Sequence, residues 1–163
     1  WERVGGRIGK KAGFVAASLL LALGAVLVYL LHGQGVAAVG AALTLVGIGY
    51  AGAQMFPMAM LPDAAAVDAD RTGESRVGVY TGVWTAAETL GLALGPGVYG
   101  LVLMLGGYVS STDGAAAQPD SAITAMTLGF TVLPALLVLG SLLLLRGYRI
   151  DEAAVVAAGE AAR

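Results

Sequence analysis

One carboxylic acid stands inside a long apolar stretch, and its position predicts chemistry. Glu88 follows Arg76 by twelve residues, which is about 18 Å along a helix. A charged side chain at such a depth in a bilayer costs on the order of 3 kcal/mol or more, so it usually faces a water-filled cavity or a partner group. We expect Glu88 to line the path of a substrate or a proton. The alternative is a neutral Glu88 that bonds a neighbouring helix and is purely structural.

Aromatic residues share a helical face with this acid. Steps of three or four positions connect Tyr80, Trp84, Glu88, Gly91, Gly95 and Tyr99. Flat rings stack on the apolar face of a sugar and a carboxylate accepts its hydroxyl groups, so this face suits a sugar. Tyr and Trp also gather at membrane interfaces, and Tyr80 and Tyr99 remain candidates for anchors there. Tyr50, Gln54 and Met58 form a weaker stripe of the same kind, and we add Tyr50 and Gln54 to the candidate cavity-lining residues.

A charged segment over residues 63–76 lies between two apolar stretches and predicts a loop. Its mixed charges suggest a gate in which ion pairs exchange between two conformations. We assign this gate to Asp63, Asp68, Asp70 and Arg76. A merely solvated loop is the alternative, since exposed ion pairs contribute only about 0–1 kcal/mol each.

Other kinds of chemistry find no support in the sequence. Cysteine is absent, and the lone histidine, His32, lies in a short polar gap. The segment after Asp68 opens like a calcium loop, but Val79 stands where that loop requires Glu. No phosphate-binding loop, nucleophile elbow or zinc motif occurs. We therefore predict no enzyme, no metal and no cofactor, and the lack of a basic block predicts no nucleic-acid partner.

The composition predicts an all-α membrane protein with four transmembrane helices. Hydrophobic residues make up 58% of the chain and charged residues 12%, far from the balance of a soluble domain. Four apolar stretches reach the length that crosses a bilayer, about 20 residues: 12–31, 36–61, 77–109 and 123–145. Within them, small residues at short spacing predict close helix packing: Gly40, Gly47, Gly49 and Gly52, then Ala87, Gly91 and Gly95.

The basic residues predict the topology. Every Lys and Arg lies before the first stretch, between the second and third, or after the fourth. Because cytoplasmic loops carry the excess of Lys and Arg, both ends of the chain should be cytoplasmic. We expect a cytoplasmic loop over 1–11, a four-helix transmembrane part over 12–145, a cytoplasmic tail over 146–163, and a multi-pass location in the plasma (inner) membrane.

Two motifs resemble a known family. The first runs from Leu61-Pro62-Asp63 through Thr72-Gly73-Glu74-Ser75-Arg76-Val77-Gly78-Val79-Tyr80, and the second is Leu90-Gly91-Leu92-Ala93-Leu94-Gly95-Pro96. They are similar to the glycoside–pentoside–hexuronide:cation symporters, the melibiose-carrier-like branch of the major facilitator superfamily. Arg7-Ile8-Gly9-Lys10-Lys11 resembles the basic loop before the ninth helix of that family. Two positions depart from the family pattern, Ala66 in place of an Asp and Thr89 in place of a Lys.

The resemblance implies that the four stretches are helices 9–12 of a twelve-helix carrier that works by alternating access. Its partners would be the lipid bilayer, a small solute such as a sugar or glycoside, a coupling cation (H⁺ or Na⁺), and the missing N-terminal helices, where the family keeps its cation-binding acids. The opening at Trp1 leads us to expect a C-terminal fragment. The alternatives are another major facilitator carrier, such as a proton-coupled drug exporter, and a four-helix membrane scaffold without transport activity.

Overall fold

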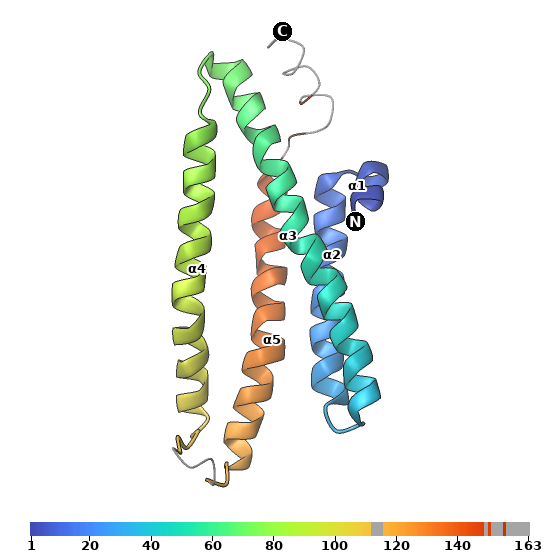
Figure 1. Cartoon of the computed structure of the whole chain (residues 1–163), viewed down its shortest axis with the longest axis vertical. Helices are drawn as coiled ribbons and strands as arrows, with labels where there is room; N and C mark the ends of the chain where they lie inside the picture. The colour runs from blue at the N-terminus through green and yellow to red at the C-terminus, as the bar shows by residue number, and fades with distance from the viewer. Residues whose placement is uncertain (112–115, 149, 151–154, 156–163) are drawn as a thin grey trace.

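The computed structural model describes residues 1–111, 116–148, 150 and 155, and this part of the chain is helical without strands. Four helices are long and apolar enough to cross a membrane, which confirms the predicted fold class. They are α2 (Lys10–Leu31), α3 (Val36–Thr72), α4 (Val77–Leu105) and α5 (Asp120–Leu144) (Figure 1). A short helix, α1 (Glu2–Ile8), precedes them, and a 3-10 turn, η1 (Leu145–Gly147), follows α5.

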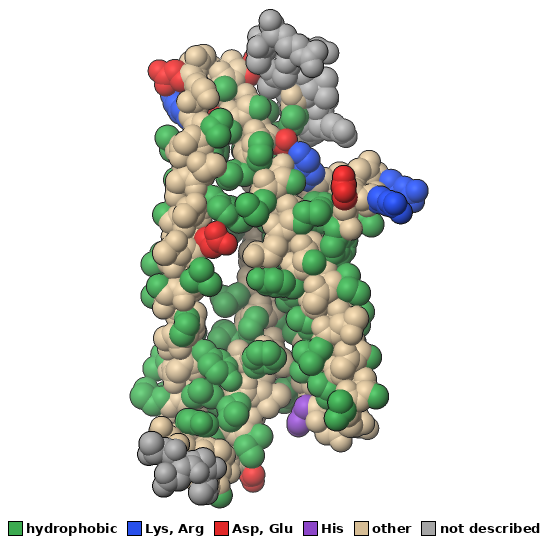
Figure 2. Space-filling view, viewed as in Figure 1, with side chains coloured by type: hydrophobic (Ala, Val, Ile, Leu, Met, Phe, Trp, Pro, Cys, Tyr) green, Lys and Arg blue, Asp and Glu red, His purple; other side chains and the backbone are tan. Residues whose placement is uncertain are grey.

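The helices run up and down past one another. Helices α2 and α3 form the most extensive pair, α5 packs against α2, and α4 stands on the other side of α5 (Figure 1). All described Lys and Arg residues lie on α1, at the start of α2, in the last turn of α3, in the α3–α4 connection or in η1, which is one end of the bundle. We call this the basic end. Hydrophobic side chains cover the helices between the two ends (Figure 2).

Small residues bring α2 and α3 into close contact. A Cβ at Gly24 would lie 2.7 Å from the backbone nitrogen of Val46, and one at Gly49 would overlap the backbone of Leu21. A Cβ at Gly52 would lie 2.6 Å from the Cβ of Ala17. Without side chains at these positions the two backbones can approach closely, as expected for helices in lipid.

The packing prediction is confirmed for only part of the glycines that we named. Gly49 and Gly52 pack tightly against α2. A Cβ would meet nothing within 4 Å at Gly40, Gly47, Gly91 or Gly95. Helix α4 in particular contains no buried residue, so its glycines are not explained by packing within the described part of the chain.

The prediction of a loop over residues 63–76 is wrong. Helix α3 continues to Thr72, and only Gly73–Arg76 connects it to α4. Alanine, which has the highest helix propensity, is frequent over 64–69, and the helix continues past Pro62 despite the lost backbone donor. Gly73 ends the helix in the left-handed conformation, with φ 71°, and donates its N–H to the carbonyl of Ala69 at 2.8 Å.

The prediction of a loop over residues 1–11 is also wrong in part. Residues 2–8 form α1, and Gly9 separates α1 from α2 with a φ of 84° that favours glycine. The indole of Trp1 donates to the carbonyl of Ile48 at 2.7 Å and packs edge-on against Phe56. Phe56 is 1% exposed, because its ring also fills the space beside Gly5 and Gly13. The contacts of Phe56 thus hold α1 against α2 and α3.

Candidate functional site

The predicted aromatic face of α4 is present, but its members differ in role. Tyr80, Trp84 and Tyr99 are half-buried on a helix that is otherwise almost entirely exposed. The hydroxyl of Tyr99 donates to the carbonyl of Met126 at 3.5 Å, and its ring packs against Gly129 of α5. Tyr99 therefore anchors α4 on α5, whereas the side chains of Tyr80 and Trp84 have no hydrogen bond within the described residues.

Glu88 lies on α4 closer to the basic end than to the other end. It follows Val77 by eleven positions, about 16 Å along the helix. Its side chain is exposed, so α2, α3 and α5 do not provide the burial that a deep acid requires. Among the described helices α4 packs mainly against α5 and less against α3, and the exposed Glu88 side chain is free to face a bilayer, a cavity or further protein.

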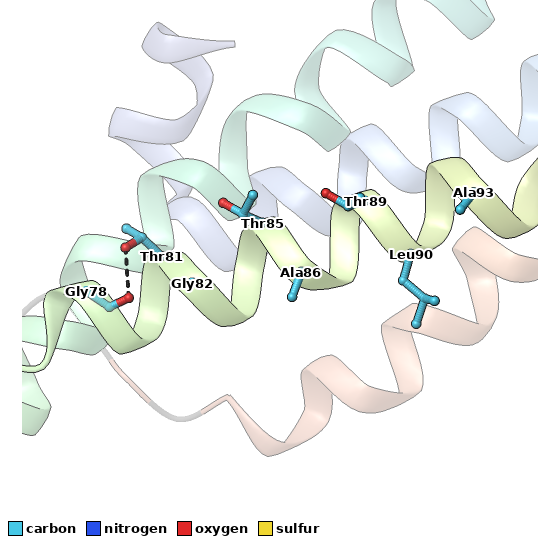
Figure 3. A pocket seen from close by; sticks show the side chains of 8 residues that line it. All are labelled: Gly78, Thr81, Gly82, Thr85, Ala86, Thr89, Leu90 and Ala93. Carbon is cyan, nitrogen blue, oxygen red and sulfur yellow. Dashed lines mark hydrogen bonds between the residues drawn. The ribbon is translucent and has the colours of Figure 1, made fainter.

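The sequence analysis missed a row of threonines beside Glu88. Thr81, Thr85 and Thr89 repeat every four positions and line a shallow groove of about 780 Å³ along α4. Small residues complete its lining together with Leu90: Gly78, Gly82, Ala86 and Ala93. Figure 3 shows Thr85 and Thr89 pointing to the same side of α4, and Leu90 on the opposite edge of the groove. The four-residue period was visible in the sequence, but we searched for ionisable and aromatic side chains only.

The row of threonines and the aromatic face lie next to each other beside Glu88. Residues three and four positions apart are neighbours on a helix surface, so Trp84 and Thr85 both flank Glu88. The hydroxyl of Thr81 donates to the carbonyl of Val77 at 3.0 Å, whereas Thr85 and Thr89 donate to no group among the described residues. We refer to Trp84, Thr85, Glu88 and Thr89 as the polar face of α4. It offers a ring, hydroxyl groups and a carboxyl group at one level.

The stripe predicted on α3 lies apart from this face. Tyr50 is 57% exposed, and Gln54 and Met58 are exposed as well. Gly49 and Gly52 face α2, so the stripe lies on the opposite, free side of α3. Among the described residues, no hydrogen bond or aromatic contact joins Tyr50 or Gln54 to the polar face of α4.

The predicted gate residues fall into two ion-pair groups at the basic end. The Nζ of Lys10 lies 2.5 Å from an Asp63 oxygen, and also donates to the carbonyl of Ala59 at 3.1 Å. Arg76 lies 4.0 Å from a carboxylate oxygen of Asp68 and 3.2 Å from one of Glu74. Asp70 is exposed and forms no ion pair within the described residues. Lys10 was not among our candidates, since a partner 53 positions away carries no local signal. Glu74 was not named either, although it lies only two positions from Arg76.

The residue after η1 contacts the start of α2 at the basic end. The Nζ of Lys11 donates to the carbonyl of Tyr148 at 2.5 Å, which links the start of α2 to the residue after η1. Burial raises the pKa of the Tyr148 hydroxyl, and the nearby Asp63 carboxylate raises that pKa further. Tyr148 is therefore a neutral hydroxyl group at physiological pH. Residues 112–115, 149, 151–154 and 156–163, which include most of the predicted tail, lie outside the described residues.

The comparison with protein families agrees with the long apolar helices and their one-sided charges. A model of the family "MFS/sugar transport protein" matches residues 1–152. The chain belongs to this family. Membership confirms the resemblance to major facilitator sugar symporters that the motifs after Leu61 indicated, and the family is one of transporters.

The sequence of a curated relative matches part of the chain. The chain is 35% identical over 109 residues to an uncharacterized symporter of Synechocystis sp. (strain ATCC 27184 / PCC 6803 / Kazusa). The match covers 66% of this chain and 20% of the relative, so the chain spans about a fifth of the length of the protein it matches. No solved structure matches the chain.

Proposed function

We propose that this chain is the C-terminal part of a carrier that moves a sugar or glycoside across the plasma (inner) membrane together with a cation. The family match over residues 1–152 is the observation that carries the proposal. The printed description of the relative as a symporter supports the coupling to a second solute. The four helices would be the last four of the carrier, and further helices of the same polypeptide would complete it.

The polar face of α4 would contribute to the substrate site. A sugar presents hydroxyl groups at its edge and an apolar face, and Trp84 and Glu88 are suited to these two features. Thr85 and Thr89 would add hydroxyl groups that can donate or accept. Helix α4 is exposed along this face, which supports the idea that it lines a water-filled cavity between the two halves of the carrier. Tyr80 would extend the same wall, and Tyr50 and Gln54 would contribute only if α3 turns its free side to the cavity.

The ion pairs of the basic end would act as a gate. Lys10–Asp63 joins α2 to α3, and Arg76–Asp68 joins the α3–α4 connection to α3. Lys10 and Arg76 are 44% and 45% exposed, and exposed pairs contribute only about 0–1 kcal/mol each. Such pairs break and reform at low cost, as a gate between two conformations requires. The excess of Lys and Arg supports a cytoplasmic position for this end, and both ends of the chain would then be inside.

A substrate screen tests the proposal. Cells that lack their own sugar carriers would express the full-length protein and receive labelled hexoses, pentoses, hexuronides and glycosides in turn. We expect uptake of at least one of these compounds above that of cells with an empty vector. No uptake of any sugar, together with export of lipophilic drugs from the same cells, would instead support the drug-exporter alternative.

A further inference from the structure

Helix α4 carries one charged residue, Glu88, and no Lys, Arg or His. Helix α5 carries no basic residue either, and the described Lys and Arg of the rest of the chain lie at the basic end. Arg76, the cation closest to Glu88 along the chain, is twelve positions away, and it already lies 3.2 Å from Glu74. The polar face of α4 thus combines a ring and hydroxyl groups with a carboxyl group, and none of its residues offers a positive charge.

The groove along α4 brings hydrogen-bonding groups and open backbone together. Thr85 and Thr89 line it next to Glu88, and both point to the same side of the helix (Figure 3). A Cβ at Gly78 or Gly82 would meet nothing within 4 Å, so no described helix covers this part of the groove. A flat ring can therefore approach the backbone of α4 closely.

A sugar hydroxyl group and a sugar carboxylate group interact differently with this face. A hydroxyl group can donate to the carboxylate of Glu88 and accept from Thr85 or Thr89. A carboxylate group only accepts, so it can bond the threonines but not an ionised Glu88. Two like charges repel each other more strongly in a protein cavity than in bulk water, and an anion that leaves water needs a cation as its partner. A sugar acid therefore meets an unfavourable group where a neutral sugar meets a favourable one.

We propose, on the basis of the sugar-carrier function above, that Glu88 makes the carrier selective for sugars without a carboxylate group. A hexose, a pentose or a neutral glycoside binds with one hydroxyl group donating to Glu88. A hexuronate is excluded by the repulsion between its carboxylate and that of Glu88. Thr85 and Thr89 bind hydroxyl groups of both classes and contribute little to the choice.

Uptake of matched neutral and acidic sugars tests this selectivity. Proteoliposomes that contain the full-length carrier receive one neutral compound (glucose, galactose, xylose or methyl β-glucoside) or one acid (glucuronate, galacturonate or methyl β-glucuronide), and mass spectrometry measures the accumulated compound. We expect the fastest acid to enter at least about tenfold more slowly than the fastest neutral sugar. A smaller difference, or faster entry of an acid, would overturn the selectivity and leave the sugar-carrier function intact. No uptake of any of these compounds would contradict both.

The amides of the acids separate charge from shape. Glucuronamide and galacturonamide have nearly the same shape as their acids but no charge. We expect each amide to enter at least about fivefold faster than its acid, because only the acid is repelled by Glu88. Equal exclusion of amide and acid would show that the site rejects the larger group whatever its charge, and would overturn the proposal.

Substitutions assign the selectivity to Glu88. Glu88→Gln removes the charge and should lower the ratio of neutral to acidic sugar uptake at least about fivefold, whereas Glu88→Asp keeps the charge and should keep the preference. Asp120→Asn, the same type of change outside the polar face, should leave the ratio unchanged. If a variant no longer transports, isothermal titration calorimetry of the purified carrier with the same compounds gives the ratio from binding. An unchanged ratio in Glu88→Gln, or an equal decrease in Asp120→Asn, would overturn the proposal.

Discussion

The ammonium group of Lys10 lies 2.5 Å from the carboxylate of Asp63, which fastens the first turn of α2 to α3. If this pair is part of a gate, Lys10→Gln and Asp63→Asn should each lower the rate of uptake. The decrease should be about fivefold or less, because an exposed ion pair contributes only about 0–1 kcal/mol. The exchanged pair, Lys10→Asp with Asp63→Lys, should recover part of the rate. Uptake by the three variants, normalised to protein in the membrane, measures this. A double exchange that is slower than either single variant would argue against pairing.

Arg76 offers a second test of the gate. It lies within reach of both Asp68 and Glu74, and its removal leaves both acids without their cation. We expect Arg76→Ala to lower uptake while the amount of protein in the membrane stays the same. Arg71→Ala removes the same type of side chain from the last turn of α3 and should transport normally. Normal transport by Arg76→Ala would show that the α3–α4 connection is a solvated loop without a gating role.

The positions of Lys and Arg predict the topology of the chain. We expect a reporter fused after Arg149 to be cytoplasmic and one inserted at Gly114 to be external, because α5 lies between the two positions. Phosphatase and fluorescent-protein fusions report the two sides with opposite signals. Both reporters on the same side of the membrane would remove the four-span arrangement.

The packing of α2 on α3 predicts a contrast between two nearby glycines. A Cβ at Gly49 would overlap the backbone of Leu21, whereas a Cβ at Gly47 would meet nothing within 4 Å. Gly49→Ala should therefore lower the thermal stability of the purified protein, by about 1–3 kcal/mol for an overpacked site. Gly47→Ala should be neutral or stabilising, since Ala favours the helix. Equal unfolding temperatures of the two variants would contradict this packing.

The sequence predicted the spans because hydropathy depends on each residue's own side chain. The first and last residues of α2 and α5 lie within three positions of the predicted ranges, and α4 ends four residues early. The extension of α3 was missed because Asp63, Asp68 and Asp70 concealed an alanine-rich helix. The partner of Asp63 could not be predicted, since the contact depends on how α2 lies against α3. The threonines beside Glu88 were predictable from their period.

Substitutions of Glu88 distinguish a functional role of the polar face of α4 from a structural one. If it binds the substrate or carries a proton, Glu88→Gln keeps the shape but removes the titratable group. We expect this variant of the full-length carrier to insert normally, yet to lose substrate affinity or the pH dependence of uptake, and Glu88→Ala to do worse. Asp120→Asn, the same type of change in the first turn of α5, should leave uptake unchanged. Unchanged uptake at every pH in Glu88→Gln would support a structural role.

Gradient-driven accumulation tests the central claim most directly. Proteoliposomes that contain the full-length carrier would be loaded with buffer and diluted into the sugar identified by the screen, with an inward gradient of H⁺, of Na⁺ or of neither. We predict that the sugar accumulates above its external concentration with one of the two gradients, and that it only equilibrates when the gradient is abolished by an ionophore. Equilibration at the same rate and to the same level with and without either gradient would contradict a sugar:cation symporter.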